Sequence, residues 1–335
     1  MRFIFTPLIA GRPWCGATIY EAPLGGSESA VVYLARELAR RGHEVHVFVH
    51  GQPGVYENVV YHHVVELQAH GVPPCDVHVS SRWFEILLDS PAKFKVLWLH
   101  DMPTRIPTQF PADMVVCLSQ AQATVWEING APFVEIIGDG VDLSLFSGQE
   151  NRDKNRLVWT SNPDRGLYLA CRVFIREILP RWPDLQLHVY GRYAVYGWPL
   201  ERERWYLPPP EWLESGHIIL HAPLPKLALA RELMRSWALY YPTYWPETFC
   251  IAALEAQAAG TPVITCPEGA LPETVRGGIV SYDIINATSQ LRNARRWEKL
   301  SRWGREYATQ HSWVEIARRW EEAIILRLRM KGGQK

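Results

Sequence analysis

The sequence predicts an α/β protein built from two Rossmann-like domains, each with a parallel sheet and crossover helices. Short β-branched or aromatic runs alternate with helical patterns, and this alternation occurs in both halves of the chain. The polar stretch 147–156 separates the halves and is the natural linker. The chain has 335 residues, of which 47% are hydrophobic, so it can fill two cores.

In the first half, strands are expected at residues 2–5, 45–49, 77–80, 96–99, 115–118 and 134–137. The clearest helix precedes the second of these strands, because apolar residues recur there at helical spacing. Ser27 or Ser29 can cap this helix, and Gly42 ends it.

In the second half, strands are expected at residues 157–160, 185–190, 218–221, 238–241, 263–265 and 279–282. A long amphipathic helix then begins after Ser312, its expected cap. We therefore predict an N-terminal domain over 1–150, a C-terminal domain over 151–311, and a helix over 312–330 that returns toward the first domain.

Composition excludes some partners. Lys plus Arg equals Asp plus Glu at 35 each, which gives no basic surface for nucleic acid.

The six cysteines show no metal-type or disulfide-type spacing, as expected for reduced thiols in the cytoplasm. No segment approaches the roughly 20 apolar residues of a membrane span. The tail 323–335 alternates apolar and basic residues, so peripheral contact with the inner membrane face is open, although a packed final helix is favoured.

Two carboxylates stand eight residues apart in the otherwise apolar run 246–256. Thr248 is the expected N-cap of a helix over 249–259, which Gly260 ends. Glu247 then lies just outside the helix mouth, and Glu255 lies roughly 9 Å further along the axis. A ligand that reaches both is long and polar at both ends, as a nucleotide sugar is, and its pyrophosphate can lie against the positive helix mouth.

Three other polar positions follow predicted strands. Gly25 and Gly26 let the backbone approach a phosphate, although an ordinary turn also explains them. His100 ends a buried strand, where it can donate to sugar hydroxyls, carry a proton, or simply be a satisfied core histidine. Arg165 can hold a diphosphate bidentately or be a solvated loop arginine.

Two further segments have both a functional and a structural interpretation. The turn within 267–275 offers the amides of Gly269 and Ala270 to a hexose, or is a Pro-Gly loop. The aromatic excursion 193–212 could form an acceptor platform, but local packing is favoured. The segment 138–142 lacks the third glycine of a dinucleotide fingerprint, and we interpret it as a tight turn.

Taken together, these motifs resemble the family 4 retaining glycosyltransferases, also called glycosyl transferases group 1. The resemblance covers nearly the whole chain and is strongest over 241–264, which is similar to the two-glutamate signature helix and the strand that follows it. It implies the GT-B fold, with two Rossmann-like domains facing across a cleft. It also implies that a hexose is transferred from a nucleoside-diphosphate sugar, without metal or cofactor, to a glycan, lipid or protein acceptor.

The resemblance also implies roles for residues. Catalytic roles fall to His100, Glu247 and Arg165, and Glu255 holds the ribose. The implied nucleotide-sugar ligands are Gly25, Gly26, Arg165, Glu247, Thr248, Phe249, Glu255, Gly269 and Ala270. Thr160 or Ser161 stands where the family carries a further basic diphosphate ligand, and Cys250 where it carries glycine. A GT-B binding or scaffold protein with impaired catalysis, or a GT-B-like epimerase or phosphorylase, is the alternative.

Overall fold

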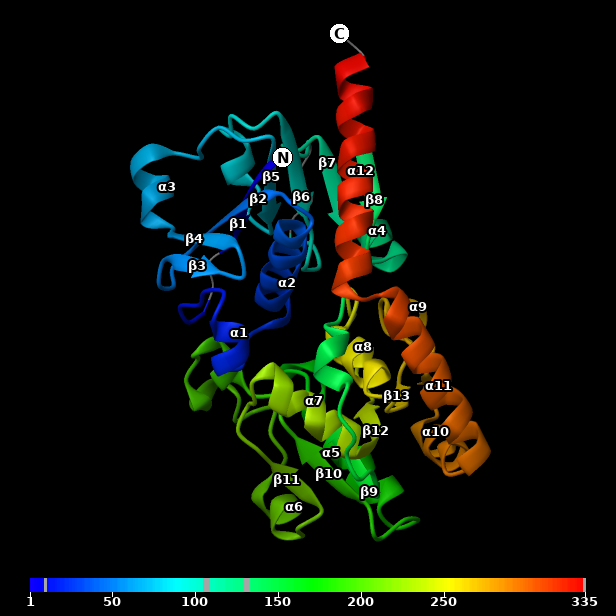
Figure 1. Ribbon diagram of the computed structural model, residues 1–335. Helices are drawn as coiled ribbons and strands as arrows, with labels where there is room; N and C mark the ends of the chain where they lie inside the picture. Colours follow the sequence, from blue (N-terminus) through cyan, green and yellow to red (C-terminus); the bar gives the residue numbers. More distant parts are fainter. Residues whose placement is uncertain (9–10, 105–108, 129–132, 334–335) are drawn as a thin grey trace. The chain divides into compact units, whose positions relative to one another are not determined.

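The computed structural model describes residues 1–8, 11–104, 109–128 and 133–333 (Figure 1). The chain divides into two compact units. Unit 1 comprises Met1–Gly140 and Trp313–Lys335, and unit 2 comprises Val141–Ser312. The first crossing between units falls at residue 140, ten residues before the expected domain boundary.

Unit 1 is built on an eight-stranded sheet with the order β3-β4-β2-β1-β5-β6-β7-β8. Its strands are β1 (Arg2–Pro7), β2 (Glu44–Val49), β3 (Gly54–Tyr56), β4 (Val59–His63), β5 (Val77–Ser81), β6 (Phe94–Trp98), β7 (Met114–Cys117) and β8 (Phe133–Ile136). All neighbouring pairs are parallel except β3 and β4. The six strands expected from the sequence are confirmed, with ends that differ by one or two residues.

The β3–β4 hairpin was not predicted. Glu57 and Asn58 connect the two strands, with φ of 47° and 65°. Two positive φ values in succession give a turn that matches the twist of antiparallel strands. Glycine or asparagine usually marks such a turn, and here glutamate fills the first position, so the sequence carried only a weak signal.

The helices of unit 1 are α1 (Thr18–Glu21), α2 (Gly26–Arg40), α3 (Val65–His70), the 3-10 turn η1 (Glu85–Leu87), α4 (Gln120–Val125) and α12 (Trp313–Gly333). The cap predicted for α2 is wrong: Gly25 is the N-cap, without a side-chain hydrogen bond, and Ser27 and Ser29 lie inside the helix. Gly42 follows the helix end with φ of +87°, a conformation that favours glycine.

The last helix, α12, returns to the first unit, as the sequence predicted, and lies beside α2 (Figure 1). Its aromatic residues fix it there. Trp313 stacks on Tyr33 of α2 with ring centroids 5.8 Å apart, and Trp320 meets Trp98 of β6 edge to face at 4.9 Å. Trp320 and Trp98 are both fully buried, so this helix is part of the core of unit 1.

Unit 2 contains a six-stranded parallel sheet with the order β11-β10-β9-β12-β13-β14. The strands are β9 (Asp153–Trp159), β10 (Gln186–Val189), β11 (Ile218–Leu220), β12 (Ser236–Tyr241), β13 (Val263–Thr265) and β14 (Gly278–Val280). All six were expected. Strand β9 begins at Asp153, so the last residues of the predicted linker are strand instead.

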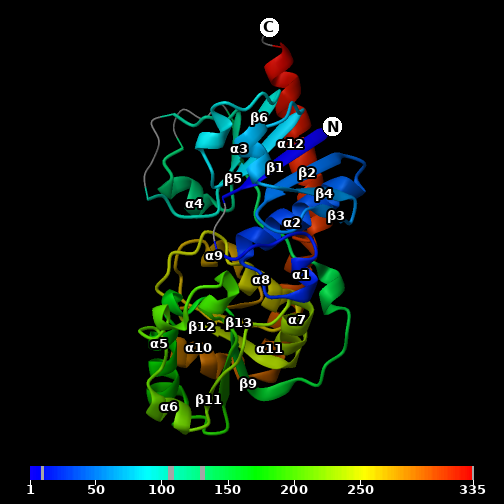
Figure 2. The ribbon, with the colours of Figure 1, turned by 90° about the vertical axis from the view of Figure 1, so that its left-hand side faces the viewer.

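Helices cover both faces of this sheet, and Figure 2 shows α5 and α6 on one side of the strands and α7 on the other. In chain order the unit contains η2 (Leu143–Phe146), η3 (Pro163–Arg165), α5 (Leu167–Val173), the π-helix η4 (Phe174–Ile178), η5 (Tyr193–Tyr196), η6 (Leu200–Arg202), α6 (Pro210–Glu214), α7 (Lys226–Arg235), α8 (Ile251–Ala258), α9 (Leu271–Thr274), α10 (Ile284–Leu291) and α11 (Ala294–Gln310). Strands and helices alternate as the sequence predicted.

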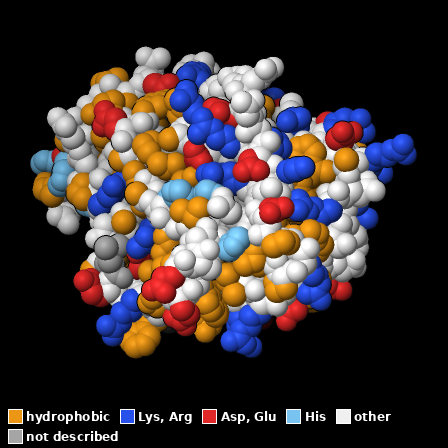
Figure 3. Space-filling view, turned by 90° about the horizontal axis from the view of Figure 1, so that it is seen from below, with side chains coloured by type: hydrophobic (Ala, Val, Ile, Leu, Met, Phe, Trp, Pro, Cys, Tyr) orange, Lys and Arg blue, Asp and Glu red, His pale blue; other side chains and the backbone are white. Residues whose placement is uncertain are grey.

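Positive and negative side chains are interspersed on the face shown in Figure 3, in keeping with the balanced composition. Among the described helices, none combines the length and the apolar character needed to cross a bilayer.

Candidate functional site

The candidate site of unit 2 lies where the strand order reverses. The chain runs from β9 outward to β10 and β11, then returns to β12 on the other side of β9. Loops that follow the two central strands therefore meet at the carboxyl edge of the sheet, where ligands bind in open parallel sheets. Arg165 follows β9, and Glu247 follows β12.

These two side chains are in direct contact. Arg165 Nη1 donates to Glu247 Oε1 at 2.8 Å and to Oε2 at 2.9 Å. The Tyr241 hydroxyl also donates to Glu247 Oε1. Glu247 is only 2% exposed, whereas the Arg165 side chain is 31% exposed. The carboxylate is thus held from two sides, and the arginine side chain is still partly exposed.

Two groups at this contact, Arg165 and Tyr241, have shifted pKa values. Burial opposes the charged form of Arg165, but the Glu247 carboxylate raises the pKa of Arg165 well above its ordinary value. Burial, and then the same carboxylate, raise the pKa of Tyr241 well above 10. The site therefore presents a permanent cation, and Tyr241 acts as a neutral hydrogen-bond donor.

Two side-chain hydroxyls hold the main chain of the Arg165 loop in place. Thr243 Oγ1 donates to the Arg165 carbonyl at 2.6 Å, and the Tyr244 hydroxyl donates to the Asp164 carbonyl at 3.0 Å. Gly166 follows with φ of +108°, so the chain can turn sharply into α5 directly after the arginine. The loop after β12 therefore orients the loop after β9.

The turn with Gly269 and Ala270 supports Glu247 through its backbone. The Ala270 amide, a predicted ligand of the donor sugar, instead donates to the Glu247 carbonyl at 2.8 Å. A Cβ at Gly269 would lie 2.3 Å from that carbonyl oxygen, and φ there is +55°. Because the two backbones approach so closely, the Ala270 amide is hydrogen-bonded within the protein and supports Glu247.

The helix of the two-glutamate motif begins later than predicted. Helix α8 starts at Ile251, and Cys250 is its N-cap in a left-handed conformation, with φ of 77°. The predicted cap at Thr248 is therefore wrong, because the chain changes direction at Cys250, two residues further on. Thr274 Oγ1 donates to the Phe249 carbonyl, which fixes the segment just before the turn.

Glu255, the second acid of the motif, lies within α8 and is 8% exposed. Lys226, the first residue of α7, donates from Nζ to Glu255 Oε1 at 2.5 Å. No sequence pattern identifies this lysine as a partner of Glu255, because no regular spacing links two residues 29 positions apart.

The predicted residues of unit 1 also lie at the carboxyl edge of their sheet. Gly25 and Gly26 open α2, and His100 follows β6. Gly25 has φ of −62°, so its conformation does not require glycine. Arg82, which no sequence motif marks, follows β5 with φ of +68° and donates from Nη2 to Glu28 Oε1 of α2 at 3.0 Å.

His100 is buried, and its ring meets the Trp98 ring edge to face at 4.3 Å. Burial, and then the nearby Arg82 guanidinium, lower the pKa of His100 well below its usual 6.5. The imidazole is therefore neutral at physiological pH, suited to hydrogen bonding with a hydroxyl and not to charge stabilisation.

The aromatic excursion after β10 packs largely on itself, in agreement with the interpretation favoured above. Tyr193 contacts Trp198 at 5.3 Å and Tyr206 at 6.2 Å, measured between ring centroids. Trp205 differs from these, being 74% exposed beside Arg204.

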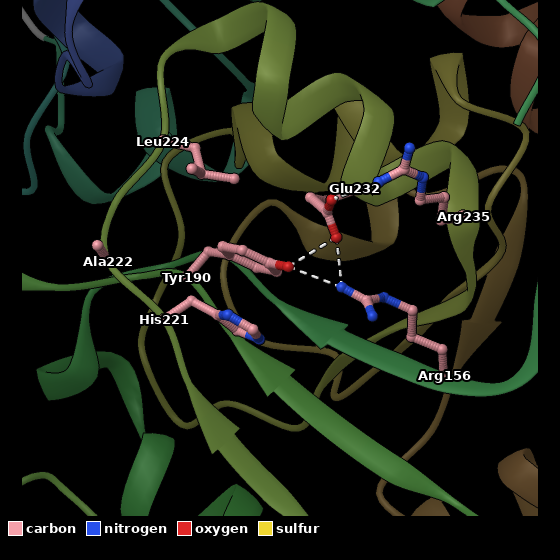
Figure 4. Close-up of a pocket in the computed structure, with 7 residues that line it drawn as sticks. All are labelled: Arg156, Tyr190, His221, Ala222, Leu224, Glu232 and Arg235. Atoms are coloured by element: carbon pink, nitrogen blue, oxygen red, sulfur yellow. Dashed lines mark hydrogen bonds and ion pairs between the residues drawn. The ribbon is translucent and has the colours of Figure 1, made fainter.

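A second polar cluster, apart from the Arg165–Glu247 contact, lines a depression of about 520 Å³ beside α7 (Figure 4). Its lining residues are Arg156, Tyr190, His221, Ala222, Leu224, Glu232 and Arg235. Arg156 donates to the Tyr190 hydroxyl at 2.7 Å and to Glu232, and the hydroxyl donates to Glu232 at 2.7 Å. Neither signature glutamate lines this depression.

The hydrogen bonds of this cluster fix two histidine tautomers. Arg156 has only donors, so His188 Nε2, at 3.3 Å, must accept. His188 Nδ1 therefore carries the proton and donates to His221 Nε2 at 2.9 Å. Both rings are neutral in this arrangement. No three His, Cys, Asp or Glu side chains, here or elsewhere among the described residues, are placed to hold a metal ion.

Comparison with known families agrees with this geometry. Residues 154–294 match the family Glycosyl transferases group 1, and residues 24–104 match Glycosyltransferase Family 4. The first match includes Arg165, Glu247 and Glu255, and the second includes Gly25 and His100. The two matches together span about two thirds of the chain.

The chain is also similar, at low sequence identity, to individual glycosyltransferases. The chain is 28% identical to a D-inositol 3-phosphate glycosyltransferase of Thermobifida fusca over 63% of its own length, and 26% identical to an MMP alpha-(1->4)-mannosyltransferase of Mycolicibacterium hassiacum over 52%. It spans 47% and 41% of these two relatives, which is less than half the length of either.

Solved structures show the same architecture. Sucrose-phosphate synthase from Thermosynechococcus elongatus matches over 100% of both chains, with a TM-score of 0.73 and 18% identity. HepE of Anabaena, solved in complex with UDP-glucose, matches over 96% of this chain and 99% of its own, with a TM-score of 0.70 and 16% identity. The predicted GT-B fold is confirmed. Each unit contains one of the two family matches, so the chain carries a domain of Glycosyltransferase Family 4 in unit 1 and a domain of Glycosyl transferases group 1 in unit 2.

Proposed function

We propose that this protein transfers a hexose from a nucleoside-diphosphate sugar to an acceptor hydroxyl, with retention of anomeric configuration and without a metal ion. The Arg165–Glu247 contact is the observation that carries this proposal. It sets a permanent cation and a buried carboxylate side by side at the switch point of the unit 2 sheet. A cation at this place can bind a diphosphate, and a carboxylate beside it can accept hydrogen bonds from the hydroxyls of a hexose.

Each half of the donor has a matching group. Both contacts between Arg165 and Glu247 use Nη1, so among the described residues Nη2 and Nε stay available to a diphosphate. The Glu247 carboxylate can accept from hexose hydroxyls, and Glu255 can accept from the ribose. Relatives of the same fold support this donor class, because the HepE structure holds UDP-glucose.

In the proposed reaction, the acceptor oxygen attacks the anomeric carbon from the face that the diphosphate leaves. The bond between that carbon and the diphosphate oxygen breaks, and the acceptor proton passes to the departing oxygen. Arg165 stabilises the negative charge that builds on this leaving group, and Glu247 keeps the hexose oriented. His100, held neutral by burial, can hydrogen-bond a sugar hydroxyl.

Donor turnover tests the proposal. We would incubate the protein with UDP-, GDP- and ADP-hexoses and acceptor mixtures and measure release of the nucleoside diphosphate. Glu247→Gln and Glu255→Gln should each lower turnover by at least about 100-fold, since each removes a charged ligand of the donor. Glu298→Gln, an exposed change on α11, is the matched control and should be neutral. Equal turnover in all four proteins would refute the assigned roles.

The finer parts of the proposal need separate measurements. Proton NMR of the first product should show the anomeric configuration of the donor, and turnover should persist in EDTA. Nucleotide-sugar binding without turnover across the panel would favour a scaffold protein. Conversion of the donor without an acceptor would favour an epimerase, and a requirement for inorganic phosphate would favour a phosphorylase.

A further inference from the structure

Lys226 and Glu255 form an ion pair between two helices that pack on each other, α7 and α8. Nζ of the lysine lies 2.5 Å from Oε1 of the glutamate, and each side chain is only 11% exposed. Removing two charges from water is strongly unfavourable unless each finds a partner, so this contact fixes both side chains.

The position of the lysine argues against a role in helix stability. Lys226 is the first residue of α7, and Pro225, its N-cap, provides no side-chain hydrogen bond. A cation at this end of a helix meets the positive end of the helix dipole, which is unfavourable. The compensating interaction is the bond to Glu255, so the reason for a lysine here is found in α8.

Helical spacing separates this pair from the other polar groups of α7. Glu232 and Arg235 face the depression shown in Figure 4. At 100° per residue, Arg235 lies about 180° around the helix from Lys226. Lys226 therefore faces α8 and the donor side, and among the described residues Glu255 is its one recorded ion-pair partner.

We propose that Lys226 is a positioning residue for the donor nucleotide, and that it acts by holding the Glu255 carboxylate in the orientation that receives the ribose. This inference rests on the proposed function, because it takes Glu255 as the ribose ligand. With Oε1 tied to Nζ, the carboxylate cannot rotate freely, and Oε2 is the oxygen presented to the ribose hydroxyls. A preorganised acceptor loses less entropy when the nucleotide binds.

The test is a thermodynamic cycle between the lysine and one ribose hydroxyl. Calorimetry would give the Kd of wild type and Lys226→Met for UDP, GDP and ADP and for their 2′-deoxy counterparts. In wild type, loss of the 2′-hydroxyl should weaken binding by about tenfold or more, as for a hydrogen bond to a charged acceptor. In Lys226→Met, removal of the 2′-hydroxyl should weaken binding by only about two- to threefold, because the Glu255 carboxylate is no longer aligned.

Two further variants keep the test decisive. Lys226→Arg retains the charge and should restore most of the discrimination, whereas a general weakening of the fold would affect both nucleotides equally. Lys226→Gln serves if the methionine variant does not fold. Lys299→Met, on α11, is the matched control and should behave as wild type.

The outcomes separate the two proposals. If wild type binds ribonucleotides and Lys226→Met discriminates as strongly as wild type, the positioning role is wrong and the proposed function stands. If wild type binds none of the nucleotides, both proposals are overturned.

Discussion

At the scale of single residues, the contact between Arg165 and Glu247 is unequal in burial. The Glu247 side chain is 3% exposed and the Arg165 side chain 31% exposed, so the acid depends on the pair far more than the base does. Without the arginine, the carboxylate would keep the Tyr241 hydroxyl as its side-chain donor. A buried charge that loses its counter-ion is among the more destabilising changes a protein can undergo.

We therefore expect Arg165→Met to lower the free energy of unfolding by about 2 kcal/mol, a value reduced from the fully buried case because the arginine is partly exposed. Glu247→Gln should cost less, since the remaining arginine can reach water. The double variant should be more stable than the sum of the two single changes predicts. Urea unfolding followed by tryptophan fluorescence measures all three, and simple additivity would contradict the coupling.

Gly269 offers a second test at this scale. Gly269→Ala should destabilise unit 2 by about 3 kcal/mol or more, because its Cβ would lie 2.3 Å from the Glu247 carbonyl oxygen and φ is +55°. Gly216→Ala is the control: φ is +72° there, but no atom lies within 4 Å of the added Cβ. That change should cost only about 1 kcal/mol, as for a strained backbone alone. Equal losses in the two variants would show that the close approach is unimportant.

At the scale of elements, the cluster beside α7 joins three strands to one helix through neutral rings. His188 stacks on His221 with centroids 5.1 Å apart, and His221 stacks on Tyr190 at 4.4 Å. Burial, Arg156 and the neighbouring histidine lower the pKa of His188 to about 4. Adding a proton to either ring breaks the relay of hydrogen bonds, so this corner of the sheet is expected to be acid-sensitive.

The lowered pKa of His188 sets the direction in which the free energy of unfolding changes with pH. Between pH 6.5 and about 4, the unfolded chain binds a proton at His188 that the folded chain does not, so stability falls as the pH falls. The loss from this residue should reach about 2 kcal/mol by pH 5. His188→Gln should flatten the profile of unfolding free energy against pH. The slope that remains includes His78, whose pKa burial lowers to about 3. An unchanged slope in the variant would exclude His188 as the origin.

At the scale of the whole molecule, unit 1 is built from two segments that flank unit 2 in the sequence. Helix α12 contributes fully buried Trp320 to that unit, in contact with Trp98 of the sheet. Unit 1 is thus completed only when α12, which follows unit 2 in the chain, has been made, whereas unit 2 is one continuous segment. Folding of unit 2 can therefore precede folding of unit 1.

Trp320→Ala should destabilise unit 1 by about 3–5 kcal/mol, the usual cost of removing a buried tryptophan. Differential scanning calorimetry of the whole chain should show the loss in one transition, with the other unchanged, because units with separate cores respond separately. Trp303→Ala, on exposed α11 surface, is the control and should leave both transitions in place. A uniform shift of the whole trace would mean that the units unfold together.

Much of this protein follows from local patterns in the sequence. All twelve expected strands are present, because β-branched runs between helical segments specify buried parallel strands with little help from context. The order of strands and helices predicted the fold, and the positions of Arg165 and His100 after their strands predicted that they lie at sheet edges. These features are local, or depend only on chain order.

Only the tertiary structure decided which groups meet. The pairing of Lys226 with Glu255, the support that the Ala270 amide gives to Glu247, and the left-handed turn at Cys250 each depend on the packing of elements distant in sequence. Periodicity reports which face of an element is buried, but a contact between two elements is set by their relative placement. The sequence therefore determined the elements and the chemical groups, and the packing determined their partners.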